Sequence, residues 1–349
     1  MDKYEYIHHE PFEFEAGGTL DDLKIVYHTS SPCKTDQQGK LKPVIWICHA
    51  LTANSDAEDW WPQLVGPGKL FDTEKYYIVC VNMLGSPYGS SSPSTTNPET
   101  GQPFYFDFPR ITVRDIVKAN ILVRQHLGLE HIDLIIGSSI GGFQAVEWLV
   151  MEPERIRKAV LMATSCRTTP WLLAWDEAMR MALEADPSFR ACADLNGGAA
   201  ALRAARAIGM LSYRSYEGYN LTQAEPDPDV IFPDRAASYQ RYQGKKFSDR
   251  FDAYSYFYLC YSADSNNVGR KRGGCEAALA RVQADCTVIG IDSDRILPLE
   301  EQRFLAEHIP GARFHQISSR FGHDGFLLES DQITAIVEPL LNLIELCKY

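Results

Sequence analysis

The 349-residue sequence has no apolar run approaching the roughly 18 residues needed to span a bilayer. Its first residues are polar and acidic, and they lack the apolar segment of a secretory signal peptide. Nine cysteines are scattered without a C-x-x-C pair, which is typical of thiols kept reduced in the cytoplasm. We therefore predict a cytoplasmic protein without a membrane partner.

Motifs for metal ions and nucleotides are also missing. No spacing of His, Cys and carboxylate residues suggests a metal site, and residues 66–69 (Gly-Pro-Gly-Lys) lack the spacing of a phosphate-binding loop. Acidic residues outnumber basic residues 46 to 34, and the net charge of −12 argues against a nucleic-acid partner. The sequence predicts a globular protein with no metal site and no nucleic-acid partner.

Short apolar runs typical of strands alternate with helical patterns, which indicates an α/β fold with a mostly parallel sheet covered on both faces. An opening hairpin is expected from residues 12–15, a Gly17-Gly18 turn and residues 23–27. The later strands are expected at residues 44–48, 77–81, 132–136, 158–162, 287–291 and 314–317.

The alternation stops between about residues 167 and 285, where helical pieces such as 171–185 are joined by irregular Tyr-rich and Pro-rich stretches. We expect residues 1–166 and 286–349 to form the core domain and residues 167–285 to be inserted as a helical lid over the site. The alternative is a second structural domain without a catalytic role.

Residues 137–141 (Gly-Ser-Ser-Ile-Gly) close an apolar run and open a helical one. A G-x-S-x-G match between a strand and a helix is typical of a nucleophile elbow, a turn too tight for bulk near the serine. The serine oxygen then lies beside a helix N-terminus, whose free N–H groups can stabilise an oxyanion. This context predicts that Ser139 is a catalytic nucleophile.

A serine nucleophile needs a histidine base oriented by an acid, and with an elbow these follow in the order Ser, Asp or Glu, His. Three histidines follow the elbow and the insertion. His308 belongs to a helical run and His315 to a strand, whereas His323 lies in a loop after the last strand. Since open α/β sheets place their sites in loops at strand carboxyl ends, His323 is the predicted base.

The acid should follow the preceding strand, which offers Asp292 and Asp294. Position favours Asp294, which lies further into the loop, but leaves both open. An oxyanion needs two donors. We expect the N–H of Ile140, directly after the nucleophile, and that of Leu51 in the loop after an early strand. His49, in the same loop, is expected to shape it.

Together these features resemble the homoserine O-acetyltransferases of the α/β-hydrolase superfamily, over nearly the whole chain. Several blocks in the right order are more specific than the elbow alone. They are residues 49–52 (His-Ala-Leu-Thr), 59–61, 66–69, 112–115, 137–141, 213–215, 242–247, 250–253 and 322–327.

The resemblance implies a ping-pong reaction with acetyl-CoA as co-substrate and no permanently bound cofactor. Acetyl-CoA would acylate Ser139, and an amino-acid hydroxyl would then attack the acyl-enzyme with His323 as base. The family's aspartate matches Asp294. The resemblance also implies that Arg214 binds the amino acid's carboxylate, for which a guanidinium is suited, and that Asp324 binds its ammonium. A homodimer is implied by this likeness alone.

Several positions depart from the family pattern. Ala53 replaces a usual glycine, Ser92 replaces another, and Tyr254 stands where asparagine is usual. None removes a catalytic group. We expect them to bear on the specificity for acceptor and acyl donor, since Ala53 borders the oxyanion loop and Tyr254 lies in the lid.

The expected reaction converts acetyl-CoA and L-homoserine to O-acetyl-L-homoserine and CoA, a step of methionine biosynthesis. Close alternatives use succinyl-CoA or serine. An esterase-type hydrolase would need the same triad, with water reaching the acyl-enzyme. The intact set of Ser139, Asp294 and His323 argues against a non-catalytic binding protein.

Overall fold

A computed structural model describes residues 1–346 and shows one eight-stranded mixed sheet in the order β1-β4-β6-β5-β7-β8-β9-β10. β4 pairs antiparallel with β1 and with β6, and all pairs from β6 to β10 are parallel. The strands are β1 (Asp2–His8), β4 (Leu23–Thr29), β5 (Val44–Cys48), β6 (Tyr77–Val81), β7 (Ile132–Ser138), β8 (Ile156–Met162), β9 (Asp285–Ile291) and β10 (Arg313–Ile317).

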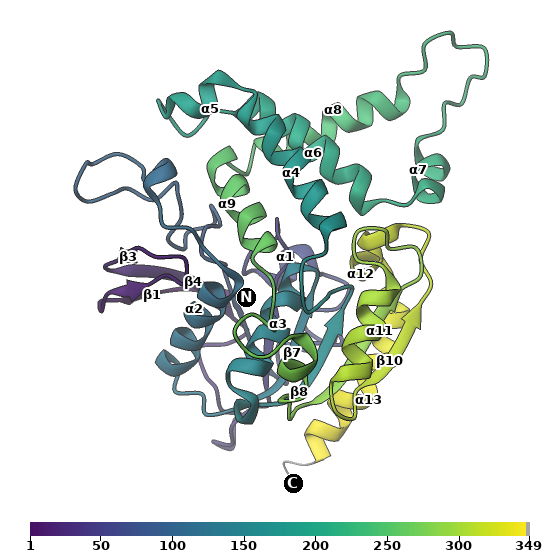
Figure 1. Cartoon of the computed structure of the whole chain (residues 1–349). Coiled ribbons are helices and arrows are strands. Elements are labelled where there is room, and N and C mark those ends of the chain that lie inside the picture. Colours follow the sequence, from purple (N-terminus) through teal and green to yellow (C-terminus); the bar gives the residue numbers. More distant parts are fainter. Residues whose placement is uncertain (347–349) are drawn as a thin grey trace.

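The sheet is the middle of three layers (Figure 1). Every residue of β5, β6 and β7 is buried, because helices cover both faces of these strands. Along β5, Trp46 packs with α2 (Val113–His126) and α3 (Ile140–Met151), while Ile45 and Ile47 face the cluster that contains α13 (Ser330–Leu346). This alternation of faces fixes which helices lie on each side. The other core helices are α1 (Ala57–Trp60), α11 (Leu299–His308) and α12 (Gly325–Leu328).

The predicted opening hairpin is partly wrong. Residues 12–15 do enter a hairpin, but β2 (Phe12–Glu13) pairs with β3 (Thr19–Leu20) in a separate two-stranded sheet. β4 pairs instead with β1, which the sequence analysis did not predict. Polar side chains along the exposed edge strand β1 hide its β character, since only part of one face is covered.

Between β8 and β9 the chain is helical and lies over one end of the sheet (Figure 1). The Tyr-rich stretch predicted to be irregular is helical, and α9 is buried at every position from Ala253 to Cys260. A helix buried all round has no polar face, so its sequence lacks the amphipathic period that signals a helix. The helices are α4 (Pro170–Glu184), α5 (Pro187–Ala191), α6 (Ala199–Tyr213), α7 (Tyr216–Gln223), α8 (Arg235–Ser248), α9 (Ala253–Asp264) and α10 (Cys275–Leu279).

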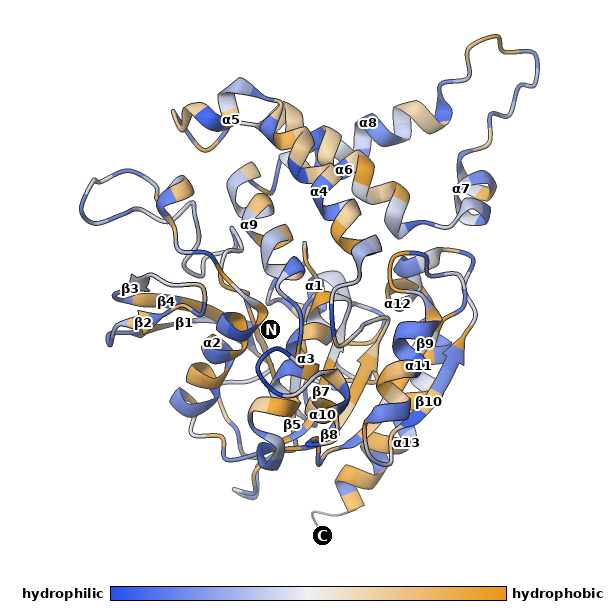
Figure 2. Ribbon diagram, viewed as in Figure 1, coloured by the Kyte–Doolittle hydropathy of each residue, from blue (hydrophilic) through white to orange (hydrophobic). Residues whose placement is uncertain are grey.

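Hydropathy follows the layers, with apolar colour gathered in the central strands (Figure 2). The loop between α7 and α8 is different: it reaches away from the body of the molecule and has an apolar tip (Figure 2). Ile231 and Phe232 lie in this loop and are exposed. No helix within residues 1–346 is long and apolar enough to cross a membrane.

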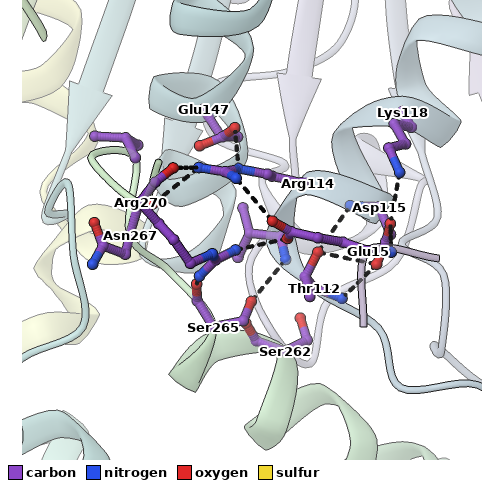
Figure 3. Close-up of polar contacts among 12 residues, drawn as sticks. Glu15, Thr112, Arg114, Asp115, Lys118, Glu147, Ser262, Ser265, Asn267 and Arg270 are labelled. Atoms are coloured by element: carbon purple, nitrogen blue, oxygen red, sulfur yellow. Dashed lines mark hydrogen bonds and ion pairs between the residues drawn. The ribbon is translucent and has the colours of Figure 1, made fainter. Parts of the chain in front are cut away.

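An ion-pair network ties the return of the chain from α9 to the core (Figure 3). Glu147 of α3, 2% exposed, accepts hydrogen bonds from Arg114 Nε at 3.0 Å and from Arg272 Nη2 at 2.6 Å. Glu15 accepts from Arg114 Nη1 at 2.8 Å and from Arg270 Nη2 at 2.6 Å. The network therefore joins α2, α3, the N-terminal segment and the loop before α10.

Glu147→Gln should lower the free energy of unfolding by about 3 kcal/mol, because breaking a buried ion pair leaves its cationic partners uncompensated. Urea unfolding followed by circular dichroism measures this change. The exposed Glu154→Gln is the matched control, and equal stability of the two variants would show that the network contributes little.

Candidate active site

Ser139 lies at the turn between β7 and α3, with φ 58° and ψ −130°. This backbone conformation is strained for a residue with a side chain and is held by its surroundings. The Ser139 N–H donates to Ala163 O at 3.1 Å, and Thr164 Oγ1 donates to Ser139 O at 2.9 Å. The end of β8 thus holds the turn in place from the side.

Two glycines of the motif are required by close backbone approach. A Cβ on Gly141 would lie 2.1 Å from Cys48 O, and a Cβ on Gly137 would lie 2.1 Å from Gly141 O. These contacts are with backbone atoms, which cannot swing aside. The elbow predicted from the sequence is therefore present, and its glycines allow α3 to sit directly against β5 and β7.

The structure brings His323 and Asp294 together. His323 lies in a single 3-10 turn, Gly322–Asp324, after β10, and Asp294 follows β9. Their Nδ1 and Oδ2 atoms are 2.6 Å apart, and both side chains are buried. Asp294 Oδ1 also accepts the N–H groups of Ile296 and Leu297, each at 3.0 Å. The carboxylate is thus oriented from its own loop toward the imidazole.

Asp292, the alternative that the sequence left open, does not contact His323. It is exposed, and its Oδ1 accepts the N–H of Ser319 at 3.1 Å, which ties the loop after β10 to the end of β9.

Burial by itself lowers the pKa of His323, but the charge of Asp294, its hydrogen bond and the charge of Asp324 outweigh it, so the pKa is raised. Asp294 accepts from Nδ1–H, which leaves Nε2 free to exchange a proton. Within residues 1–346 no hydrogen bond joins Ser139 to His323, although both line one cavity. Catalytic hydrogen bonds often tighten only when substrate is bound.

The cavity has a volume of about 460 Å³ and lies between the sheet's carboxyl edge and the helices that follow β8. Four of the predicted site residues line it beside His323: Leu51, Ser139, Ile140 and Asp324. Neither the N–H of Leu51 nor that of Ile140 donates to another group within residues 1–346. These two N–H groups are available to an oxygen bound at Ser139.

His49 is fully buried beneath Leu51, and burial lowers its pKa to about 4. Its neutral ring donates from Nδ1 to Ala50 O at 2.9 Å and accepts the Met83 N–H at Nε2, 3.1 Å away. His49 therefore holds the loop in shape, as expected from the sequence.

Arg214 and Asp324 lie together, with 2.6 Å between Arg214 Nε and Asp324 Oδ2. Asp324 lines the cavity, but Arg214 lines a separate groove beside it. Burial raises the pKa of Asp324, and the positive charges of Arg214 and His323 oppose that rise. The first role that this geometry supports for Arg214 is to keep Asp324 ionised.

Two charged residues of the cavity wall, Arg206 and Asp176, were not expected from the sequence. The Arg206 guanidinium lies over the rings of Phe247 and Tyr213, at 5.0 and 5.6 Å, and makes no ion pair within residues 1–346. Arg206 precedes Tyr213 by seven residues on α6, which is two helical turns. That spacing places both on one face and is a signal that the sequence contained.

Asp176 of α4 is buried in the wall, and burial together with the nearby Asp264 carboxylate raises its pKa well above the ordinary value. Arg180 opposes the rise, and its Nη1 lies 2.6 Å from Asp264 Oδ2. Among residues 1–346 no group of three or more His, Cys, Asp or Glu side chains is placed to hold a metal ion.

Residues 43–330 match the family model of the alpha/beta hydrolase fold. The sequence is 39% identical over 331 residues to a homoserine O-acetyltransferase of Cyclobacterium marinum, with 94% of this chain and 92% of that protein covered. The chain belongs to the homoserine O-acetyltransferase family.

Solved structures agree with the architecture. The homoserine O-acetyltransferase from Bacillus anthracis superposes with a TM-score of 0.88 at 21% identity, covering 98% of this chain and 97% of that chain. The L374D mutant of esterase E22 superposes with a TM-score of 0.87, also at 21% identity, covering 97% and 99%. At this identity both comparisons show the fold alone, which transferases and hydrolases share.

Of the three residues that depart from the family pattern, only Ala53 lines the cavity, as expected from its position. Tyr254 does not: it packs in α9 against Phe189 and Phe106, with ring centroids 5.0 and 5.5 Å away. Ser92 is buried and its Oγ lies 2.8 Å from Ser94 Oγ. Tyr254 and Ser92 are therefore packing residues, and the expectation that Tyr254 bears directly on specificity is not supported by its position.

The imidazole of His323 should titrate above the ordinary histidine value of about 6.5. Asp294→Asn should lower that pKa, because it removes the charge that stabilises the imidazolium. NMR titration of the histidine ring protons measures both. A pKa of His323 that is the same in the two proteins would contradict the electrostatic coupling.

Proposed function

We propose that Ser139, His323 and Asp294 are the catalytic triad of an acyltransferase that moves the acetyl group of acetyl-CoA to the hydroxyl of L-homoserine. The family membership supports the reaction. The observation that carries the assignment of the site is the hydrogen bond between Asp294 and His323, because His323 lines the same cavity as Ser139, which lies at a strained turn.

In the first half-reaction His323 Nε2 accepts the Ser139 proton as Oγ attacks the thioester carbon. The oxyanion lies within reach of the N–H groups of Leu51 and Ile140. When the C–S bond breaks, His323 returns the proton to the CoA sulfur, and the acetyl group remains on Ser139.

In the second half-reaction the acceptor hydroxyl transfers its proton to His323 as its oxygen attacks the acetyl carbon. The bond to Ser139 Oγ breaks, Oγ regains the proton, and O-acetyl-L-homoserine leaves. The raised pKa of His323 suits a base that must hold a proton within each half-reaction, from the attack on the carbonyl carbon until the leaving group departs.

Recognition of the amino acid needs a cation for its carboxylate and an anion for its ammonium. Asp324, next to the base and lining the cavity, supports binding of the ammonium. For the carboxylate the position of Arg206 is the more favourable, because this guanidinium has no ion-pair partner and faces the cavity, whereas Arg214 is already paired with Asp324.

Residues 167–285 would act as a lid, and residues 1–166 and 286–349 as the core. The cavity wall supports this division, because Leu172, Asp176, Arg206, Tyr213 and Arg250 all come from the segment between β8 and β9. A lid that excludes water protects the acyl-enzyme from hydrolysis and so favours transfer.

A homodimer in the cytoplasm fits two further features. Phe232 and Ile231, in the loop between α7 and α8, are 87% and 84% exposed, which is typical of residues covered by a partner. All eight cysteines within residues 1–346 are free thiols, as in a reducing compartment. Sedimentation of Phe232→Ser tests the first point, since loss of the dimer is expected if this loop forms the contact.

Wild-type protein should release CoA from acetyl-CoA continuously only when homoserine is present, because without an acceptor the reaction stops after one acyl-enzyme has formed per active site. Ser139→Ala should abolish all release because no acyl-enzyme forms. CoA release is followed with a thiol reagent, and the signal from the protein's own cysteines is subtracted. Succinyl-CoA is offered as the alternative donor and serine as the alternative acceptor. Equal release without any acceptor would favour hydrolysis, and faster release from succinyl-CoA would change the donor.

Arg206→Gln should raise the KM for homoserine by about tenfold or more, the usual effect of losing a hydrogen bond to a charged group. Steady-state kinetics with homoserine as the varied substrate measures this change.

Arg214→Gln should also raise the KM for homoserine, but the increase should become smaller as the pH rises. Removing Arg214 raises the pKa of Asp324, so Asp324 is less ionised at low pH and binds the ammonium less well there. A loss at Arg214 that is independent of pH would instead support direct contact with the substrate carboxylate.

A further inference from the structure

A groove of about 920 Å³ lies beside the cavity, and residues next to each other in the chain line the two spaces. Three segments of chain, residues 171–172, 213–214 and 295–298, contribute to both linings and so form a wall between the two spaces. The residue pairs, cavity side first, are Leu172 and Trp171, Tyr213 and Arg214, Ile296 and Arg295, and Leu297 and Pro298.

The groove presents aromatic surface to solvent. Tyr216 is 87% and Trp171 53% exposed, and the rings of Trp171 and Trp175 meet edge to face with centroids 5.6 Å apart. The hydroxyl of Tyr219, also in the lining, has no hydrogen-bond partner within residues 1–346. Flat aromatic faces left open in this way can stack on a planar ring.

The charges of the groove are positive in a protein with a net charge of −12. Arg214 and Arg295 line it, and no carboxylate does. The Arg295 guanidinium is exposed and makes no ion pair within residues 1–346. The Trp171 indole donates to Arg295 O at 2.7 Å, so the aromatic and the cationic parts are held next to each other. An anion with an attached aromatic ring fits this pairing.

We propose that this groove binds the 3′-phospho-ADP head of the acyl-CoA donor, with the adenine against the aromatic residues and the phosphates near Arg295 and Arg214. The inference rests on the proposed function, because it is the donor of that reaction that supplies the ligand. With the head in the groove, the pantetheine arm is the part of the donor that would reach from the groove to Ser139 in the neighbouring cavity. Arg214 then serves both sides, since its Nε is paired with Asp324 of the cavity.

The test compares two donors that share the reacting thioester, acetyl-CoA and acetyl-pantetheine, which lacks the nucleotide head. Arg295→Gln should raise the KM for acetyl-CoA about tenfold, as expected for loss of a hydrogen bond to a charged group, and should leave the KM for homoserine unchanged. With acetyl-pantetheine the variant and the wild type should have the same KM. Tyr216→Ala should show the same dependence on the donor.

Arg303→Gln removes another exposed arginine, which lies outside the groove, and is the matched control. Higher salt should raise the KM for acetyl-CoA in the wild type more than in Arg295→Gln, because exposed charges are screened. Equal effects of Arg295→Gln on the two donors, or no effect on acetyl-CoA, would overturn the proposal. A change in sedimentation without a change in KM would assign the groove to contact between copies of the chain.

Failure of the proposed function is recognised separately, by calorimetry with CoA itself. If the wild type turns over acetyl-CoA and Arg295→Gln changes neither turnover nor CoA binding, only the proposal for the groove is contradicted. If the wild type binds CoA and Arg295→Gln does not, but no acetyl group is transferred to homoserine, the groove is supported and the proposed reaction is contradicted. If the wild type neither binds CoA nor reacts with acetyl-CoA, both proposals are contradicted.

Discussion

The contact between Gly141 and the carbonyl of Cys48 is the constraint on which the site depends. Because no Cβ stands between them, α3 begins directly against the end of β5. This single approach brings the turn at Ser139 next to the loop that contains Leu51. Gln144, one helical turn into α3, donates to His49 O at 3.3 Å and so ties the same loop from below. The distance between the serine and both candidate oxyanion donors therefore follows from one close packing of backbone on backbone.

The same helix also connects the site to the helices above it. Glu147, two turns along α3, holds Arg114 and Arg272 and thereby anchors the chain where it returns from α9. The residues that enclose the cavity from above come from this returning segment and from α4 and α6. A displacement of α3 would move Ser139 and the base of the proposed lid together, which would couple the exclusion of water to the geometry of the proposed triad.

Adjacent parallel strands supply the remaining groups. β9 and β10 are neighbours, so the loops that follow them lie side by side at one edge of the sheet. Asp294 and His323 meet there, and Asp292 and Ser293 join the two loops through Ser319 N–H and O. The wall that follows Asp294 separates the small cavity from the open groove. An acyl donor with a large charged head and a small reacting end fits such a pair of spaces better than a single deep pocket would.

Much of this protein could be predicted from local sequence. Apolar runs determined six of the strands, the strand-turn-helix context determined the elbow, and chain order placed Ser139, an aspartate and His323 in the sequence that this fold requires. These features depend on neighbouring residues and on the rule that parallel strands end at one edge. The helix α9 escaped because it is buried all round and so has no amphipathic period, and the edge strand β1 escaped because most of its side chains are polar.

Only the tertiary structure decided which charged groups meet. Local spacing left Asp292 and Asp294 open, and packing placed Asp294 on the imidazole. Arg206 and Arg214 lie on one stretch of chain, eight residues apart, yet they face different hollows because α6 ends between them. Such contacts join residues far apart in sequence, and a rotation of one helix would exchange them. The sequence by itself therefore determined the chemistry available to the site, and the packing of the helices against the sheet edge decided which side chains can carry it out.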